Sequence, residues 1–429
     1  MKSTKNLILY KNWEYGELFD SFTWLIENYR NISTDRGEAE ALFYRCIGQL
    51  AELAASHGFE GNLWHYFIAF LLVNHENAYS RACEIRGGIG GSVNELALHD
   101  FAIIKEYFDF NIKELGDYFE ADCMDAVLRY EGCDSGRMFN RRIRDRIREL
   151  CQHLEAAEGT AEFKDAVTEF YREFGVGNLG LHKAFRIQHE ETGARIVPIT
   201  NIAHVKLDDL VGYELAKQKL IENTEAFVSG RCANNCLLYG DAGTGKSTSI
   251  KAIANQYFDR SLRLIEVYKH QFCDLHDVIA QIKDRNYKFI LYMDDLSFEE
   301  FETEYKYLKA VIEGGLEKKP DNVLIYATSN RRHLIRENFS DKEEIRQDMH
   351  TSDTVQEKLS LYARFGVTIY YGAPNKKEFQ QIVTALAEKY QIDMDNELLL
   401  AEANKWELSH GGLSGRTAQQ FVNYLLGSL

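Results

Sequence analysis

Residues 1–175 have the hydrophobic spacing of amphipathic helices. Apolar side chains recur at every third or fourth position in four stretches, at residues 39–55, 63–73, 96–110 and 139–154. This spacing places the apolar side chains on one face of each helix. No proline occurs before Pro198, so no residue in this region forces a helix to end. The pattern predicts a mainly α-helical N-terminal domain, which we place at residues 1–197.

From Leu207 onward the pattern changes to short, continuous apolar runs that are separated by helical stretches. Five runs are typical of buried strands, at residues 236–239, 263–267, 289–293, 323–327 and 367–371. Strands of this kind that alternate with helices indicate a parallel sheet with helices on both faces. After Pro374 the helical spacing returns. We therefore predict an α/β core with a five-stranded parallel sheet at residues 198–374 and a small helical lid at 375–429.

A short β-hairpin is predicted between these two regions, within residues 184–202. Its turn falls at Glu191–Gly193, where the glycine allows a tight reversal of the chain. We expect this hairpin to lead into the α/β core.

Composition excludes several classes of protein. The chain has 429 residues, of which 45% are hydrophobic and 27% are charged, so it is neither disordered nor a coiled coil. Its formal net charge of −16 argues against a basic tail for nucleic acid. The eight cysteines form no CxxC pair, and the longest apolar run, 63–73, is too short to cross a bilayer. We expect free thiols, a cytoplasmic location and no membrane contact.

A phosphate-binding loop is predicted at residues 240–247, whose sequence GDAGTGKS follows a strand and precedes a helix. Its glycines let backbone N–H groups turn toward phosphate oxygens at a helix N-terminus. Lys246 would contact the β- and γ-phosphates, and the Ser247 hydroxyl would coordinate Mg²⁺. We expect ATP and Mg²⁺ as cofactors, with the loop contributing Gly240, Asp241, Ala242, Gly243, Thr244, Gly245, Lys246, Ser247 and Thr248. The alternative is an ordinary glycine turn before a helix.

Two further apolar strands end in polar side chains that suit hydrolysis. Asp294 and Asp295 follow the run 289–293, and Asn330 follows the run 323–327 after two small polar residues. Asp294 would hold Mg²⁺ beside Ser247, and Asp295 would orient and deprotonate the attacking water. Asn330 would hold that water between the two strand ends. The alternatives are a solvated strand end and a turn-forming asparagine.

Together these motifs resemble those of AAA+ ATPases, and most closely the uncharacterised bacterial family called domain of unknown function 815. The resemblance covers residues 207–429. It rests on the phosphate loop and on five further stretches, at Leu207–Glu214, Asn234–Gly240, Asp294–Glu300, Ala327–Ile335 and Gly412–Thr417.

The resemblance implies further site residues. Leu210 and Val211 lie in a segment that packs on adenine in the family. Asn330 is similar to the sensor 1 residue, and Arg416 to the sensor 2 arginine of the lid, which touches the γ-phosphate. Arg364 is similar to the arginine finger, a guanidinium that enters the site of a neighbouring subunit. This role implies a homo-oligomer. Arg331 and Arg332 are rival candidates for that contact, and a surface ion pair is the alternative for Arg364.

Two departures from the AAA+ pattern bear on the reaction. Asp295 stands where most of these proteins have glutamate, which favours slow, switch-like hydrolysis. Residues 267–273 lack the aromatic-apolar-glycine pattern of the loop that threads polypeptides in protein translocases. We therefore do not expect threading.

The sequence leaves the physiological role open between three hypotheses. The first is an ATPase that remodels a protein partner bound through residues 1–197. The second is a nucleic-acid-dependent loader or motor, whose support is the arginine stripe Arg137, Arg141, Arg144 and Arg148 on one helix. The favoured alternative is a solvated face that pairs with the acidic residues of this domain. The third is a nucleotide-gated scaffold in which slow hydrolysis acts as a timer.

Overall fold

The computed structural model describes the chain at residues 2–31, 36–132, 139–191, 193–298, 304–313, 319–330 and 362–428. The chain divides into two compact units, Met1–Leu181 and His182–Leu429. This division differs from the boundary that we predicted after residue 197. The difference arises because the predicted hairpin pairs with a strand of the second unit.

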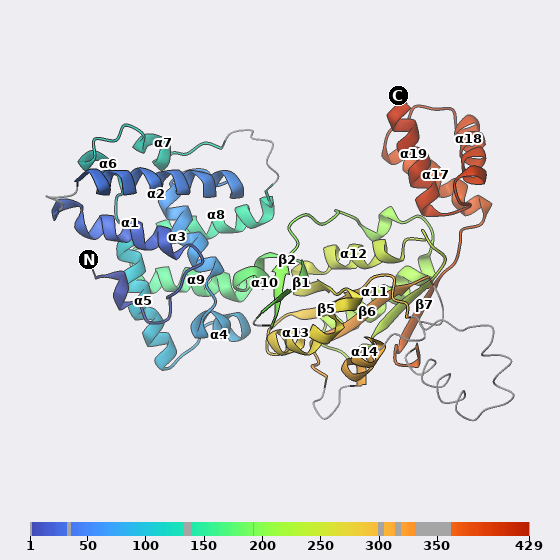
Figure 1. The fold of residues 1–429 in the computed structure, drawn as a ribbon, viewed down its shortest axis with the longest axis horizontal. Helices are drawn as coiled ribbons and strands as arrows, with labels where there is room; N and C mark the ends of the chain where they lie inside the picture. Colours follow the sequence, from blue (N-terminus) through green and yellow to red (C-terminus); the bar gives the residue numbers. More distant parts are fainter. Residues whose placement is uncertain are drawn as a thin grey trace. The chain divides into compact units, whose positions relative to one another are not determined.

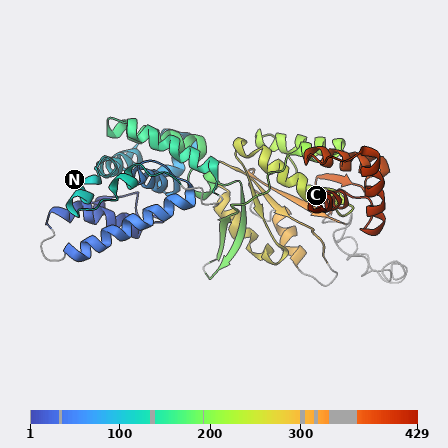
Figure 2. The same ribbon diagram turned by 90° about the horizontal axis from the view of Figure 1, so that it is seen from above.

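The first unit is built from helices, as predicted (Figures 1 and 2). They are α1 (Gly16–Asn28), α2 (Arg36–His57), α3 (Leu63–Asn74), α4 (Ala78–Arg86), α5 (Ser92–Phe108), α6 (Lys113–Tyr118), α7 (Met124–Leu128), α8 (Arg141–Ala156), α9 (Thr160–Phe174) and α10 (Gly177–Leu181). Helix α3 is buried along nearly its whole length. A helix that is apolar on all sides is typically the central, buried helix of a helical domain. The run 63–73 is therefore a core helix.

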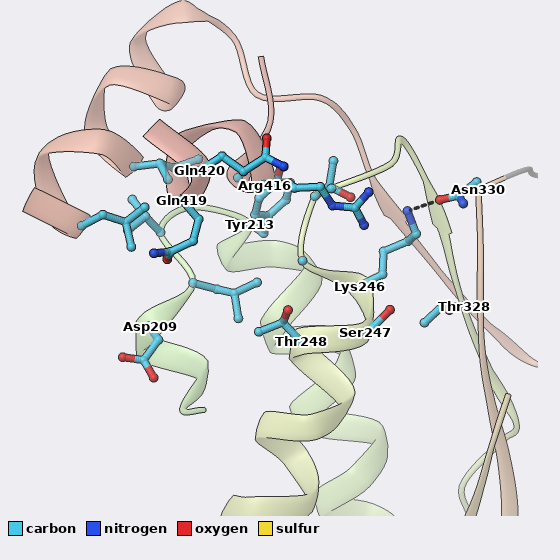
Figure 3. A pocket seen from close by; sticks show the side chains of 18 of the residues that line it. Asp209, Tyr213, Lys246, Ser247, Thr248, Thr328, Asn330, Arg416, Gln419 and Gln420 are labelled. Atoms are coloured by element: carbon cyan, nitrogen blue, oxygen red, sulfur yellow. Dashed lines mark hydrogen bonds between the residues drawn. The ribbon is translucent and has the colours of Figure 1, made fainter. Parts of the chain in front are cut away.

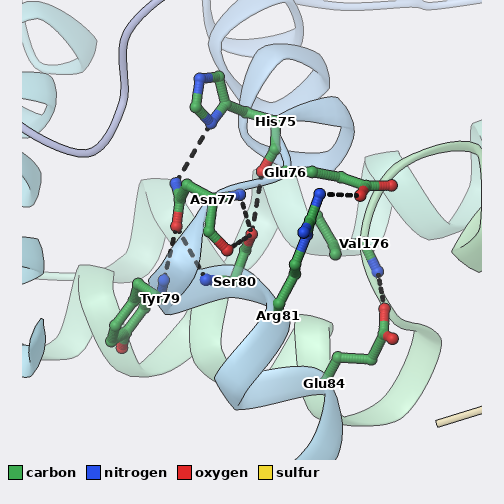
Figure 4. Close-up of polar contacts among 8 residues, drawn as sticks. All are labelled: His75, Glu76, Asn77, Tyr79, Ser80, Arg81, Glu84 and Val176. Atoms are coloured by element: carbon green, nitrogen blue, oxygen red, sulfur yellow. Dashed lines mark hydrogen bonds and ion pairs between the residues drawn. The ribbon is translucent and has the colours of Figure 1, made fainter. Parts of the chain in front are cut away.

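Several polar side chains of the first unit form hydrogen bonds with backbone groups of the same unit. At the start of α4, the Asn77 side chain accepts hydrogen bonds from the backbone N–H groups of Tyr79 and Ser80 (Figure 4). The Ser80 hydroxyl accepts the N–H of Asn77 in return. This capping box satisfies N–H groups that the first turn leaves without helical partners. Nearby, the buried Glu84 accepts the N–H of Val176, which joins α4 to the segment before α10.

The second unit contains a seven-stranded sheet in the order β2-β1-β4-β5-β6-β3-β7. The strands are β1 (Ala184–Glu190), β2 (Gly193–Pro198), β3 (Cys236–Gly240), β4 (Leu262–Glu266), β5 (Lys288–Met293), β6 (Val323–Ser329) and β7 (Val367–Tyr371). The last five are the strands that we predicted. A five-stranded sheet was nevertheless wrong, because β1 pairs in parallel with β4 and carries β2 as an antiparallel edge strand.

Helices α11 to α14 pack on the sheet, and helices α17 to α19 follow it in the chain. These are α11 (Glu214–Val228), α12 (Lys246–Gln256), α13 (Leu275–Ile282), α14 (Glu304–Glu313), α17 (Lys376–Lys389), α18 (Asn396–Ser409) and α19 (Gly415–Ser428). Helices α11 and α12 share one apolar cluster with the sheet, and α13 and α14 lie on its other side (Figure 1). Helices α17 to α19 form a cluster of their own. Across the described ranges, we find no helix with the length and apolar character needed to span a membrane.

Candidate functional site

A cavity of about 620 Å³ opens at the carboxyl ends of strands β3, β5 and β6 (Figure 3). Parallel strands place their following loops at one edge of a sheet, which is where ligands bind in open α/β folds. Helices α17 and α19 supply the opposite wall. The cavity is lined by Asp209, Leu210, Val211, Tyr213, Gly243, Thr244, Gly245, Lys246, Ser247, Thr248, Asp294, Asp295, Thr328, Asn330, Ile382, Leu386, Gly415, Arg416, Gln419 and Gln420.

The loop after β3 has a backbone that needs glycine at defined positions. Gly240 has φ of 135°, and a Cβ there would lie 2.1 Å from the carbonyl oxygen of Tyr371. Gly245 has φ of 91°, and a Cβ there would lie 2.3 Å from the Leu210 side chain. Any other residue would therefore strain the backbone at either position, and at Gly240 it would also clash with the backbone of β7. The loop then enters α12, whose first residue is Lys246.

Lys246 is almost fully buried at the floor of the cavity. Its ammonium donates hydrogen bonds to the carbonyl oxygens of Gly240 at 2.9 Å and Asp241 at 2.6 Å. A third goes to the Asn330 side-chain oxygen at 3.1 Å (Figure 3). Burial lowers the pKa of Lys246, although nearby carboxylates, Asp241 first among them, oppose this shift. A buried ammonium with only neutral acceptors is well suited to an anionic ligand.

Asp294 and Ser247 form an oxygen-rich pair beside the loop. The Ser247 hydroxyl donates to Asp294 Oδ1 at 2.7 Å, and the Thr328 hydroxyl donates to the same oxygen at 2.6 Å. Partial burial raises the pKa of Asp294, but the hydrogen bonds from Thr328 and Ser247, together with smaller contributions that include the charge of Lys251, lower the pKa overall. An ionised carboxylate and a hydroxyl are the oxygen ligands that Mg²⁺ uses. The residues present therefore fit this cation.

Asp295 and Asn330 meet across the neighbouring strand ends. The Asn330 amide donates to Asp295 Oδ1 at 2.8 Å while its oxygen accepts from Lys246. Asp295 adopts a left-handed backbone with φ of 49°, which is uncommon for a residue with a side chain. Strand β6 lies between β5 and β3, so Asn330 stands between the acid pair and the phosphate loop.

The C-terminal helices contact the same loop. The backbone N–H of Arg416 donates to the carbonyl oxygen of Gly243 at 3.2 Å, and the Arg416 side chain extends beside the loop (Figure 3). Val211 packs against the apolar cluster of α17 to α19. Lys389, at the end of α17, donates to Asp209 at 2.7 Å. The segment 209–211 therefore connects the C-terminal helices to the α/β core.

Most of the predicted site residues line the cavity. These are Leu210, Val211, Gly243, Thr244, Gly245, Lys246, Ser247, Thr248, Asp294, Asp295, Asn330 and Arg416. Three loop residues are not among its lining: Gly240, Asp241 and Ala242. Two of these have structural contacts instead, because Gly240 abuts Tyr371 and the Asp241 carboxylate accepts the N–H of Ala373 at 2.7 Å.

Arg364 lies away from this cavity. It precedes β7, and β7 runs parallel to β3, with Val367 paired to Cys236 and Tyr371 paired to Gly240. Arg364 is therefore at the amino end of the sheet. Val367, three residues after it, is already about 13 Å along the strands from the level of Gly240, at a rise of about 3.3 Å per residue. Arg331, Arg332 and Arg137 lie outside the described residues.

Several residues that line the cavity were not predicted from the sequence. From the α/β core they are Asp209, Tyr213 and Thr328, and from the C-terminal helices Ile382, Leu386, Gly415, Gln419 and Gln420. Tyr213 is fixed by stacking on Tyr371 and by a hydrogen bond from its hydroxyl to the carbonyl oxygen of Gly372. Gly415 lies in the stretch Gly412–Thr417 that carries the resemblance, but only Arg416 of that stretch was predicted as a site residue. The other C-terminal residues carry no motif that marks them, because their place in the cavity depends on how α17 and α19 pack.

Comparison with known protein families gives a match for the second unit. The family described as "Protein of unknown function (DUF815)" matches residues 180–429, which is more than half of the chain. The chain belongs to this family. The predicted resemblance to it is confirmed. The matched region begins just before β1, so DUF815 covers the whole sheet and the C-terminal helices.

Solved structures add little to this assignment. Two mutants of RuvB from Thermotoga maritima each show 17% identity and cover 51% of this chain, with TM-scores of 0.35 and 0.36. The chain spans 63% and 64% of their respective lengths. Likenesses this weak carry no argument here. Among curated proteins, no match was found.

Proposed function

We propose that this DUF815 protein is an AAA+ ATPase that binds ATP with Mg²⁺ in the cavity and hydrolyses it. The observation that carries the proposal is the convergence of Lys246, the Ser247–Asp294 pair and the Asn330–Asp295 pair at one edge of the sheet. Each group matches one requirement of phosphoryl transfer, namely phosphate binding, cation binding and orientation of water. A structural turn before a helix would need none of the three.

In this proposal each residue has a defined task. Lys246 exchanges its carbonyl contacts for phosphate oxygens, and backbone N–H groups at the start of α12 add positive potential. Ser247 and Asp294 would hold Mg²⁺, which neutralises charge on the phosphates when bound. Asp295 accepts a proton from the attacking water, and Asn330 orients that water. Leu210 and Val211 would face the base, and Arg416 would contact the γ-phosphate from the lid formed by α17 to α19.

Arg364 would act on a neighbouring copy of the chain. Its place at the amino end of the sheet prevents it from reaching the cavity of its own chain. An arginine finger in trans would stabilise charge in the transition state of the neighbour, which requires a homo-oligomer. Arg331 and Arg332 stay rival candidates for this contact.

The N-terminal helices would bind the partner that the ATPase remodels, which we propose to be a protein. The nucleic-acid alternative gains no support from α8. Arg144 and Arg148 both contact Asp145, Arg148 also faces Glu60, and Arg146 lies over the Phe174 ring. These contacts fit the solvated face. All described cysteines are free thiols, which supports a reducing, cytoplasmic location.

Phosphate release from ATP tests the proposal. The wild type should release phosphate only with Mg²⁺ present. Asp295→Asn should bind ATP with unchanged affinity and release phosphate at least about 100-fold more slowly, because it lacks the general base. Equal rates for the two proteins would refute the assignment. Affinity capture with Asp295→Asn, followed by identification of the proteins that co-purify, would then identify the partner.

A further inference from the structure

We propose that Thr328 is a positioning residue that holds the carboxylates of Asp294 and Asp295 in their orientations. It contributes no predicted ligand and would touch neither ATP nor water in the mechanism above. Its hydroxyl donates to Asp294 Oδ1 at 2.6 Å and accepts the backbone N–H of Asp295 at 2.9 Å. One side chain therefore contacts both acids. The inference rests on the proposed function.

The register of the sheet puts Thr328 in this place. Strands β5 and β6 are parallel, and Met293 pairs with Ala327. The next residues along the two strands are Asp294 and Thr328, so these residues lie side by side where the strands end. Thr328 is 2% exposed, which leaves its hydroxyl little access to water. A buried hydroxyl that uses both its donor and an acceptor position holds a fixed orientation.

The contact to Asp294 affects cation binding. Asp294 Oδ1 accepts from both Thr328 and Ser247, and the Ser247 hydroxyl keeps this proton when its lone pair coordinates a cation. The second hydroxyl fixes the rotation of the carboxylate about its side-chain bonds. Without it, Asp294 would lose the partner that holds it beside Ser247.

The contact to Asp295 affects the general base. Asp295 has a left-handed backbone, and only a few per cent of residues with side chains adopt it. Two hydrogen bonds from Thr328 hold this turn, since its hydroxyl accepts the N–H of Asp295 and its carbonyl oxygen accepts the N–H of Leu296 at 2.7 Å. This turn directs the Asp295 carboxylate toward Asn330. Without the Thr328 hydroxyl, the Asp295 carboxylate would no longer be held in the orientation that faces Asn330.

Matched substitutions separate this role from simple packing. Thr328→Val keeps the shape of the side chain and removes the hydroxyl, whereas Thr328→Ser keeps the hydroxyl and removes a methyl group. The probe is a fluorescent ATP analogue, and its affinity is measured on the full chain with Mg²⁺ and with EDTA. Hydrolysis of ATP is measured in parallel.

We expect Thr328→Val to bind the analogue in EDTA as the wild type does. With Mg²⁺ it should lose most of the tightening that the cation gives the wild type, and its kcat should fall by about ten-fold or more. Thr328→Ser should stay within about three-fold of the wild type in both measurements. If the valine variant does not fold, Thr328→Ala replaces it.

Two results would overturn the inference. In one, Thr328→Val matches the wild type in Mg²⁺-dependent binding and in kcat. In the other, Thr328→Ser fails as badly as Thr328→Val, which would assign the effect to packing. A wild type that binds no nucleotide under either condition would instead refute the proposed function, so the two failures are distinguishable.

Discussion

One buried and one exposed aspartate show the difference between a carboxylate that completes a fold and one that is open to a ligand. Asp100 in the first unit is fully buried and accepts the backbone N–H groups of Ile8, Leu9 and Tyr10. Asp294 in the second unit accepts two hydroxyls and lines a cavity. The partners of Asp100 are backbone N–H groups and the His99 ring of its own unit, whereas one partner of Asp294 is itself a cation ligand by type. The comparison teaches that burial alone does not mark a functional acid.

Two buried lysines extend this comparison and give the largest expected effect. Lys246→Ala should lower ATP affinity by about 100-fold or more, and hydrolysis should be lost with it, because charge-assisted hydrogen bonds to phosphate disappear. Lys105 is the matched control, since its ammonium donates to the carbonyl oxygen of Ala157 and to Asp109 in the first unit. Calorimetric titration with ATP should show unchanged affinity for Lys105→Ala. Retained binding by Lys246→Ala would contradict the site.

The carboxyl end of the sheet holds the cavity, whereas Arg364 lies at the amino end, where we propose that it acts on a neighbouring subunit. Substitution of Arg364 tests this role. Arg364→Ala should spare ATP binding and lower hydrolysis by about 1,000-fold, as expected when an arginine finger is removed. Phosphate release is the measurement. Mixing Arg364→Ala with Asp295→Asn should partly restore turnover, because a mixed pair contains one intact site. Absence of any restoration would argue against a contact in trans.

Substitution of Asp100 should affect the stability of the first unit and leave the nucleotide site unchanged. Asp100→Asn should lower the free energy of unfolding of the first unit by about 3 kcal/mol, because an amide cannot replace a carboxylate that accepts several N–H groups. Urea unfolding followed by tryptophan fluorescence would measure this loss. ATP affinity per folded molecule should not change. A fall in affinity at full folding would show that the first unit contributes to the site.

The smallest expected effect is a pH dependence of nucleotide binding. Phosphate binding requires the charged form of Lys246, and burial lowers the pKa of this ammonium from its ordinary value. Affinity should therefore be full below the lowered pKa and fall as the pH rises through it, at lower pH than for an exposed lysine. Titration of ATP affinity across the alkaline range would show the decline. Constant affinity up to the ordinary lysine pKa would contradict it.

The parts of the structure that depend on local sequence could be predicted. The loop at 240–247 and the five apolar strands follow from neighbouring residues, and the structure contains both. The pairing of β1 with β4 could not be predicted, because it joins segments about 80 residues apart whose patterns do not specify each other. Thr328 was missed for a related reason. Its contact with Asp294 depends on the register between β5 and β6, which no local pattern gives.

The crystal structure of the chain with a non-hydrolysable ATP analogue and Mg²⁺ is the most direct test of the account. We expect phosphate oxygens on the backbone N–H groups of residues 243–248 and on Lys246, with the cation at Ser247 beside Asp294. We also expect the base between Leu210 and the C-terminal helices. A nucleotide bound elsewhere, or a cavity that stays empty at saturating nucleotide, would contradict it.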